Sequence, residues 1–266
     1  MRLTLIQPDL YWLDPVANRA MLEEQIFALP EPTDLIVLPE MFTTGFTMDA
    51  PAVAEPMNLT TFTWLRQMAA QTGAVVTGSY VVQAKGEYYN RLVWMEPDGQ
   101  FATYDKRHLF RMAGEDGTYS AGTHRLVREW KGWRICPLIC YDLRFPVWSR
   151  NVPIAPDADS TQAAPAYDLL LYVANWPAPR RNAWNTLLQA RAIENLSYVV
   201  GVNRVGTDGN GHRYTGDSAV IDFKGEVLFR QADEVVVHQT SLSLDELHAF
   251  RNQFPAHLDA DRFTLA

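Results

Sequence analysis

The amino-acid sequence predicts an α/β fold in which strands and helices form separate layers. Two short apolar runs, at residues 34–38 and 168–173, have the continuous hydrophobic character of central strands that are buried on both faces. Amphipathic stretches of helical length separate such runs, and strand-rich stretches that turn at proline and glycine lie between them. Because helices that alternate with buried strands pack as layers over a sheet, we expect a layered α/β architecture.

The composition suits one large globular domain or two smaller ones that share a core, since 47% of the 266 residues are hydrophobic and 20% are charged. No apolar run reaches the roughly 18 residues that a membrane span requires, and the N-terminal residues lack the apolar core of a signal peptide. We therefore expect a cytoplasmic protein. The formal net charge of -8 and the lack of a basic stripe argue against nucleic acid or an anionic membrane as a partner.

In the first half of the chain, capping and turn residues separate the expected strands from the expected helices. Asp14 and Pro15 are typical of an N-cap and a first helical position, and Gly73 is placed to end a helix in the left-handed conformation. The expected elements are a strand at 2–7, a helix at 15–29 with Val16, Met21, Leu22 and Ile26 toward the core, a strand at 34–38, a helix at 60–71, a strand at 74–82, and a hairpin of strands 88–95 and 100–105.

The second half of the chain continues the alternation. A strand ends at Cys140, and the expected elements after it are a helix at 145–150, a strand at 168–173, a helix at 181–195, a strand at 198–202, a hairpin of strands 217–223 and 226–230, a strand at 234–239 and a short helix after Leu244. Residues 151–166 are rich in Pro, Ala and Asp without periodicity, which indicates a surface insertion. The two hairpins of similar design hint at a duplicated half-domain with pseudo-symmetric sheets.

The two cysteines, Cys136 and Cys140, lie on one expected strand. Four residues of extended chain separate their Cα atoms by about 13 Å, whereas a disulfide needs a separation below about 7 Å. We therefore expect free thiols and a reducing, intracellular environment. The six histidines are scattered, so the short ligand spacing of a zinc site is missing and we expect neither a metal nor another cofactor.

Four residues with reactive side chains follow expected strands or lie in the long polar loop at 105–122: Glu40, Lys106, Glu115 and Cys140. A thiol becomes a good nucleophile only when a base takes its proton and a positive charge stabilises the thiolate. Glu40 can supply the base and Lys106 the charge. When a thiolate attacks an acyl carbon, Lys106 and the backbone N–H of Tyr141 can also stabilise the oxyanion that forms.

Each of these residues also has an ordinary structural explanation. Cysteine is usually a small buried hydrophobic residue, and we keep that interpretation for Cys136. Lys106 could be a solvated hairpin end, Glu115 a turn residue, and Arg144 a surface charge or an ion-pair partner. Their joint placement after strands, rather than any single residue, indicates a site for covalent thiol chemistry with Cys140 as the nucleophile.

The sequence resembles the nitrilase superfamily, the carbon-nitrogen hydrolases, over nearly its whole length. The matching segments are Leu38-Pro39-Glu40-Met41-Phe42, residues 104–110 with Gly114-Glu115, and residues 140–146. This resemblance implies that Glu40, Lys106 and Cys140 form the catalytic triad, with Glu115 as an auxiliary acid. It also implies a single domain over residues 1–266, a four-layer α-β-β-α sandwich with pseudo-symmetric halves, and a homodimer or larger homo-oligomer.

Within that superfamily the chain looks most like the Nit2-type ω-amidases, through residues 172–180, 190–195 and 201–211. The resemblance implies a small-molecule substrate, a 2-oxo dicarboxylic acid monoamide such as 2-oxoglutaramate or 2-oxosuccinamate, whose terminal amide is hydrolysed through a cysteine thioester. Two departures concern loop shape and subfamily rather than the triad. The segment 151–166 is longer than expected, and Val147 stands where many relatives have an acid.

A monoamide of this kind carries a carboxylate far from the amide, and such a group is best bound by an arginine that donates two hydrogen bonds. The sequence leaves three candidates unranked, namely Arg144, Arg180 and Arg204. Phe42 and Trp176 are candidates for the apolar wall of the pocket, although large aromatic residues also serve as core packing.

Several other functions fit the same residues. A nitrilase or an N-carbamoyl amino acid hydrolase would use the same Glu-Lys-Cys triad. A binding protein that has lost activity is disfavoured because all three triad residues are present. A redox protein that uses Cys136 and Cys140 would require a reversible disulfide, which the expected strand spacing disfavours.

Overall fold

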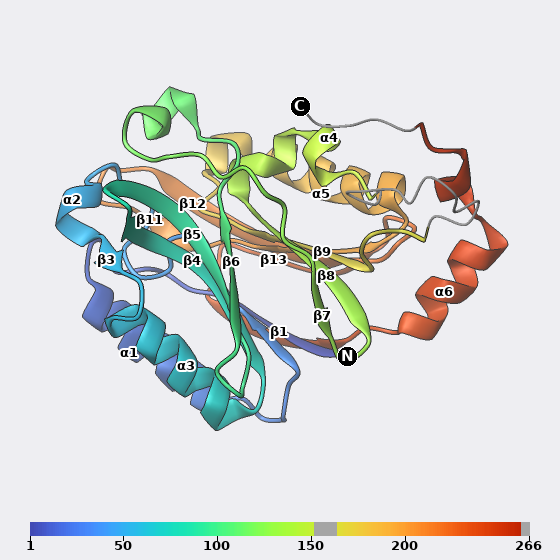
Figure 1. Ribbon diagram of the computed structural model, residues 1–266, viewed down its shortest axis with the longest axis horizontal. Helices are drawn as coiled ribbons and strands as arrows, with labels where there is room; N and C mark the ends of the chain where they lie inside the picture. The colour runs from blue at the N-terminus through green and yellow to red at the C-terminus, as the bar shows by residue number, and fades with distance from the viewer. Residues whose placement is uncertain (152–163, 262–266) are drawn as a thin grey trace.

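The computed structural model describes residues 1–151 and 164–261, which form two stacked β-sheets with helices on their outer faces. Helices α1 (Pro15–Phe27) and α3 (Thr60–Thr72) cover the outer face of one sheet, and α5 (Arg181–Asn195) covers the outer face of the other (Figure 1). The expected α-β-β-α order of layers is therefore confirmed. The insertion expected at 151–166 falls largely on residues outside the described ranges and stays a prediction.

The first sheet has the strand order β14-β1-β2-β4-β5-β6, with β3 paired to β4. Its central strands β1, β2 and β4 are parallel, whereas β14 pairs antiparallel with β1 and the β4-β5-β6 strands form antiparallel hairpins. The strands are β1 Arg2–Gln7, β2 Leu35–Val37, β3 Glu55–Pro56, β4 Val75–Ala84, β5 Glu87–Met95, β6 Phe101–Asp105 and β14 Val236–Ser241.

The second sheet has the order β11-β12-β10-β9-β8-β7, with β13 paired to β12. Its three central strands, β8, β9 and β10, are parallel, as in the first sheet, and β12 with β13 is its antiparallel hairpin. The strands are β7 Arg128–Trp130, β8 Trp133–Ile139, β9 Leu169–Val173, β10 Tyr198–Val202, β11 Val205–Thr207, β12 Arg213–Ile221 and β13 Val227–Ala232. The similar strand pattern of the two sheets agrees with the expected pseudo-symmetry.

The capping residues act as the sequence predicts. The Asp14 carboxylate accepts a hydrogen bond from the Ala17 N–H at the start of α1, and Gly73 ends α3 with a φ of 66°. The remaining helices are α2 Ala50–Val53, α4 Pro146–Ser149 and α6 Leu244–Gln253, and the short 3-10 helices are η1 Arg111–Ala113, η2 Glu115–Gly117, η3 Cys140–Arg144, η4 Ala178–Arg180 and η5 Ala256–Asp259. None of the described helices is both long and apolar enough to cross a membrane.

Two sequence expectations need correction. Val16 was expected to face the core but is 70% exposed, because the inward side of α1 carries Asn18, Leu22 and Ile26, with Met21 partly buried against the same core. The last strand, expected at 234–239, begins at Val236 and joins the first sheet beside β1. Local hydrophobic patterning could not reveal the partner of this strand because the two strands lie at opposite ends of the sequence.

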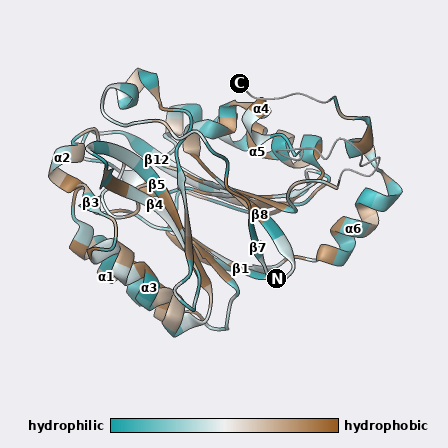
Figure 2. Ribbon diagram, in the orientation of Figure 1, coloured by the Kyte–Doolittle hydropathy of each residue, from teal (hydrophilic) through white to brown (hydrophobic). Residues whose placement is uncertain are grey.

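The main core lies between the two sheets. Leu3, Leu5 and Val37 of the first sheet pack in one buried cluster with Ile135 and Leu170 of the second. Figure 2 shows this arrangement as hydrophobic strands in the middle of the molecule and helices with many hydrophilic residues around them. Because strands of both sheets are rigidly packed, residues that follow β2, β6, β8 and β9 are held in fixed positions relative to one another.

Candidate active site

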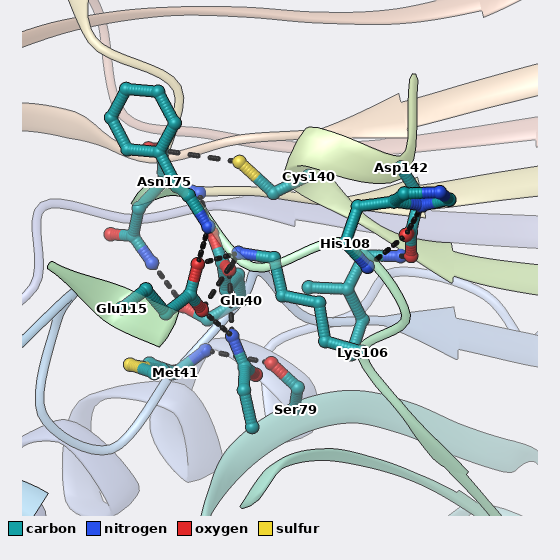
Figure 3. Close-up of polar contacts among 12 residues, drawn as sticks. Glu40, Met41, Ser79, Lys106, His108, Glu115, Cys140, Asp142 and Asn175 are labelled. Atoms are coloured by element: carbon teal, nitrogen blue, oxygen red, sulfur yellow. Dashed lines mark hydrogen bonds and ion pairs between the residues drawn. The ribbon is translucent and has the colours of Figure 1, made fainter. Parts of the chain in front are cut away.

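The sequence-predicted triad is brought together at the ends of three strands. Glu40 follows β2, Lys106 follows β6 and Cys140 follows β8 (Figure 3). Glu115, which begins η2, reaches the same cluster. Glu40 and Cys140 thus come from parallel central strands of the two sheets, as is usual for site residues in α/β folds, while Lys106 comes from the antiparallel edge strand β6.

Lys106 lies between two carboxylates in the interior of the protein. Its Nζ is 2.8 Å from Glu40 Oε1 and 2.9 Å from both carboxylate oxygens of Glu115, and all three side chains are at most 1% exposed. Burial alone would lower the pKa of Lys106, but the negative charges of Glu115 and Glu40 outweigh it and raise the pKa above its ordinary value. The ammonium group therefore stays charged throughout the physiological pH range.

Glu115 is fixed by more than its ion pair. The backbone N–H of Phe110 also donates a hydrogen bond to Glu115 Oε2. Burial raises the pKa of Glu115 above its ordinary value, while Lys106 acts in the opposite direction and the charge of Glu40 adds to the rise. Glu115 and Glu40 thus share one ammonium group, and the protonation of one affects the other.

Glu40 accepts three hydrogen bonds to its carboxylate. The donors are Lys106 Nζ and Asn90 Nδ2, each 2.8 Å from Oε1, and the Asn175 backbone N–H, 2.8 Å from Oε2. The side chain of Asn175 also donates to the Glu40 backbone carbonyl. With donors on both oxygens, the carboxylate has a fixed orientation.

Sequence reasoning missed both asparagines. Asn175 follows β9 as Glu40 follows β2, and a polar residue directly after a buried strand was an available signal. Asn90 lies inside β5 and offered no signal of this kind, because only its neighbours across the sheet show what its side chain touches.

Cys140 has a strained backbone with a φ of 44° at the start of η3. The buried carboxylate of Asp142 holds this turn through hydrogen bonds from the Ile139 backbone N–H at 3.0 Å, the His108 backbone N–H at 3.0 Å and the Tyr104 hydroxyl at 2.6 Å. His108 Nδ1 lies 2.7 Å from the same carboxylate (Figure 3). Asp142 therefore ties the turn that carries the thiol to the segment that carries Lys106.

Cys140 is 8% exposed as a residue, and its Sγ lies 4.0 Å from the backbone carbonyl oxygen of Asn175. Burial and then the negative charge of Glu40 raise its pKa well above the ordinary value, while Lys106 acts to lower it. Burial and the Glu40 charge thus favour the neutral thiol, which lies near the Asn175 carbonyl oxygen as a hydrogen-bond acceptor. Burial likewise raises the pKa of Cys136 to about 12, which agrees with a packing role inside β8.

A cavity of about 1150 Å³ opens next to the cluster. Cys140, Lys106 and Asn175 line one part of it, and Tyr141 and Trp176 also line it. Further lining residues are mostly apolar or cationic and include Trp12, Phe46, Phe110, Met112, Arg144 and Arg180.

Two of the three candidate arginines line this cavity. The guanidinium of Arg144 lies 5.1 Å from the centre of the Trp176 ring, and that of Arg180 lies 5.0 Å from the centre of the Phe110 ring. Neither forms an ion pair with a carboxylate of the described residues, so each guanidinium can accept an anionic partner.

The structure does not bring Arg204 or Phe42 to the cavity wall. Arg204 is fully buried and its Nη2 lies 2.9 Å from Asp9 Oδ1, so its charge already has a partner. Phe42 packs in the core against the rings of Trp64 and Tyr80. Both residues had been candidates for substrate contact because sequence alone does not show the direction in which a side chain points.

Comparisons with known proteins agree with this geometry. A family model described as carbon-nitrogen hydrolase matches residues 2–252. Omega-amidase YafV of Escherichia coli (strain K12) is 47% identical over 100% of this chain and 98% of that protein, and 2-oxoglutaramate amidase of Bacillus subtilis (strain 168) is 31% identical over 97% and 96%. A crystal structure of a CN-hydrolase superfamily protein from Xanthomonas campestris, with an arsenic adduct in its active site, has 47% identity, a TM-score of 0.95 and coverage of 100% and 99%. The chain therefore belongs to the carbon-nitrogen hydrolase family, the nitrilase superfamily, and is a hydrolase of the omega-amidase type that acts on amides.

Proposed function

We propose that this enzyme hydrolyses the terminal amide of 2-oxo dicarboxylic acid monoamides, such as 2-oxoglutaramate and 2-oxosuccinamate, and releases ammonia. The observation that supports the proposal is the meeting of a thiol, a carboxylate and an ammonium group beside a cavity. The wall of this cavity also holds Arg144 and Arg180, which form no ion pair with a carboxylate among the described residues. The printed names of the relatives, an omega-amidase and a 2-oxoglutaramate amidase, favour the same substrate class.

In the first half of the proposed reaction, the Glu40 carboxylate takes the proton of the Cys140 thiol as the sulfur attacks the amide carbon. The carbonyl oxygen becomes an oxyanion, which Lys106 and the backbone N–H of Tyr141 stabilise. Glu40 then gives its proton to the amide nitrogen, the carbon-nitrogen bond breaks, and ammonia leaves. The product of this half is a thioester between Cys140 and the acyl group.

In the second half, water attacks the thioester carbon and Glu40 takes a proton from the water. The carbon-sulfur bond breaks, the acid product leaves, and the proton on Glu40 returns to the sulfur of Cys140. The enzyme thus regains its neutral thiol and ionised carboxylate. Glu115 holds Lys106 in position through both of its carboxylate oxygens and contributes no proton.

The cations of the cavity favour a substrate with a carboxylate. We propose that Arg144 and Arg180 bind the carboxylate distant from the amide, because both line the cavity and neither pairs with a carboxylate in residues 1–151 and 164–261. Arg204 has no such role because it pairs with Asp9. The ring of Trp176 would hold the Arg144 guanidinium in place through a cation–π contact and form part of the apolar wall of the cavity.

The substrate class can be tested by ammonia release from a panel of compounds. We expect 2-oxoglutaramate and 2-oxosuccinamate to be hydrolysed with a kcat/KM at least about 100-fold above that of glutamine, a simple organic nitrile or a carbamoyl amino acid, since the cavity must match both ends of the substrate. Preferential turnover of the nitrile would instead indicate a nitrilase, and preferential turnover of the carbamoyl compound an N-carbamoyl amino acid hydrolase.

The arginine assignment predicts a change in KM. Arg144→Glu and Arg180→Glu should each raise the KM for 2-oxoglutaramate by about 10-fold or more, because a charge-assisted hydrogen bond is replaced by repulsion. Arg144→Lys should give an intermediate KM, since it keeps the charge and loses the two-pronged contact. Arg66→Glu, on the exposed side of α3 and away from the cavity wall, is the matched control. An unchanged KM in both cavity variants would show that the carboxylate binds elsewhere.

We also propose that the enzyme works in the cytoplasm as a homodimer or larger homo-oligomer. The two free thiols suit a reducing compartment. Exposed apolar side chains on and near the outer helices, including Ile193 on α5, Phe254 and Leu258, offer surface that a second copy could bury.

A further inference from the structure

We propose that Asn90 is a positioning residue that holds the Glu40 and Glu115 carboxylates in their working arrangement without adding charge to the site. The inference rests on the proposed function, in which Glu40 carries the proton during catalysis. It extends that function to a residue inside a strand that does not itself line the cavity.

Asn90 touches three of the charged residues at once. Its side-chain Nδ2 donates to Glu40 Oε1 at 2.8 Å and lies 3.4 Å from Glu115 Oε1. Its backbone carbonyl accepts a hydrogen bond from the Lys106 N–H at 3.0 Å. The residue is fully buried in the middle of β5, so these contacts are fixed by the sheet rather than by a flexible loop.

The orientation of the Asn90 amide follows from its neighbours. Both groups next to Nδ2 are carboxylate oxygens, which accept hydrogen bonds, so the NH2 end must face them and the carbonyl end must point away. In that orientation Asn90 Oδ1 is buried and has no hydrogen-bond partner among the described residues. The NH2 group is therefore the end of the side chain that contacts the two carboxylates.

A neutral donor fits the charge balance of the site. Lys106 already supplies the positive charge that Glu40 and Glu115 share, and a second cation would make Glu40 a weaker base. A third carboxylate would force the cluster to hold an extra proton. Glu40, Lys106, Glu115 and Cys140 interact electrostatically with one another, and charges of this cluster also act on Tyr119 and Tyr214.

Two substitutions separate the positioning role from simple packing. In Asn90→Asp, the acidic limb of the pH profile of kcat/KM should move to higher pH by about one unit or more, because a carboxylate replaces a donor next to Glu40. In Asn90→Leu, kcat should fall by about 10- to 100-fold while KM changes little, because the base is less well oriented but the substrate contacts remain.

The matched control is Asn195→Asp, which places a new carboxylate at a buried asparagine outside the cluster. It should lower the thermal midpoint but leave the acidic limb in place. The inference is overturned if Asn90→Asp folds and keeps the wild-type pH profile, or if both Asn90 variants change only the thermal midpoint.

A measurement that needs no turnover distinguishes this inference from the proposed function. The pH profile of the rate at which iodoacetamide alkylates Cys140 should move to higher pH in Asn90→Asp. The same measurement on Cys140→Ala gives the background from alkylation of Cys136. If the wild type releases no ammonia from any amide of the panel but the alkylation profile shifts, the proposed function fails and the role of Asn90 in the cluster stands. If the wild type is active and the alkylation profile does not move, the role of Asn90 fails alone.

Discussion

Cys140→Ala is expected to lower the rate of ammonia release from the preferred amide by about 10⁴-fold or more. The reason is that covalent catalysis needs the nucleophile and its base together, so that the loss of the nucleophile abolishes it. The side chain of Cys140 is small and lines the open cavity, so its loss leaves no enclosed void and should change the fold little. Steady-state ammonia release and the thermal midpoint, measured on the same preparation, check both parts of this expectation.

The matched control is Cys136→Ala, four residues earlier on the same strand. Cys136 is fully buried inside β8, so this variant should lose stability through the small cavity it leaves and keep wild-type kcat. Mass spectrometry of the quenched wild-type reaction should find the acyl adduct on the peptide that contains Cys140. Turnover of Cys140→Ala near the wild-type rate, or an adduct on another residue, would refute the thioester mechanism.

Lys106→Met is expected to remove activity and also to lower the free energy of unfolding by about 3–5 kcal/mol, because it leaves Glu40 and Glu115 buried without their cation. Buried carboxylates without a counter-charge have a pKa in the folded state above that in the unfolded chain. The variant should therefore lose stability as pH rises above about 4.3, the ordinary pKa of glutamate, and regain it as pH falls and the carboxylates take up protons. Urea unfolding at pH 4, 5.5 and 7 measures this trend.

Two further variants test the electrostatic explanation. Glu115→Gln in the Lys106→Met background removes one of the stranded charges and should restore part of the lost stability at pH 7 without restoring activity. Arg91→Met breaks an ion pair with Asp105 whose side chains are 14% and 22% exposed, and it should cost less than Lys106→Met because water can still reach the Asp105 carboxylate that is left. Equal losses of stability for Lys106→Met and Arg91→Met would show that the buried charge of Lys106 has no special effect on stability.

Much of the fold could be predicted from local sequence. The helices at 60–72 and 181–195 and the strands at 2–7 and 198–202 were expected with nearly the observed bounds, because apolar periodicity and caps such as Asp14 and Gly73 act over a few residues. Pairing between distant strands was not predictable in this way. The contact of β14 with β1 depends on the whole sheet, and no local pattern encodes it.

The same distinction between local sequence and tertiary structure applies to the candidate site. The sequence alone determined which residues carry reactive groups, since Glu40, Lys106, Glu115 and Cys140 stand in recognisable segments after strands. Only the tertiary structure decided which of them share an ion pair and that Asn90 bridges two carboxylates. It also decided that Arg144 and Arg180 line the cavity, whereas Arg204 forms an ion pair with Asp9. The reason is physical: residue type fixes the chemistry of a side chain, but its direction and its partners are set by how the two sheets pack.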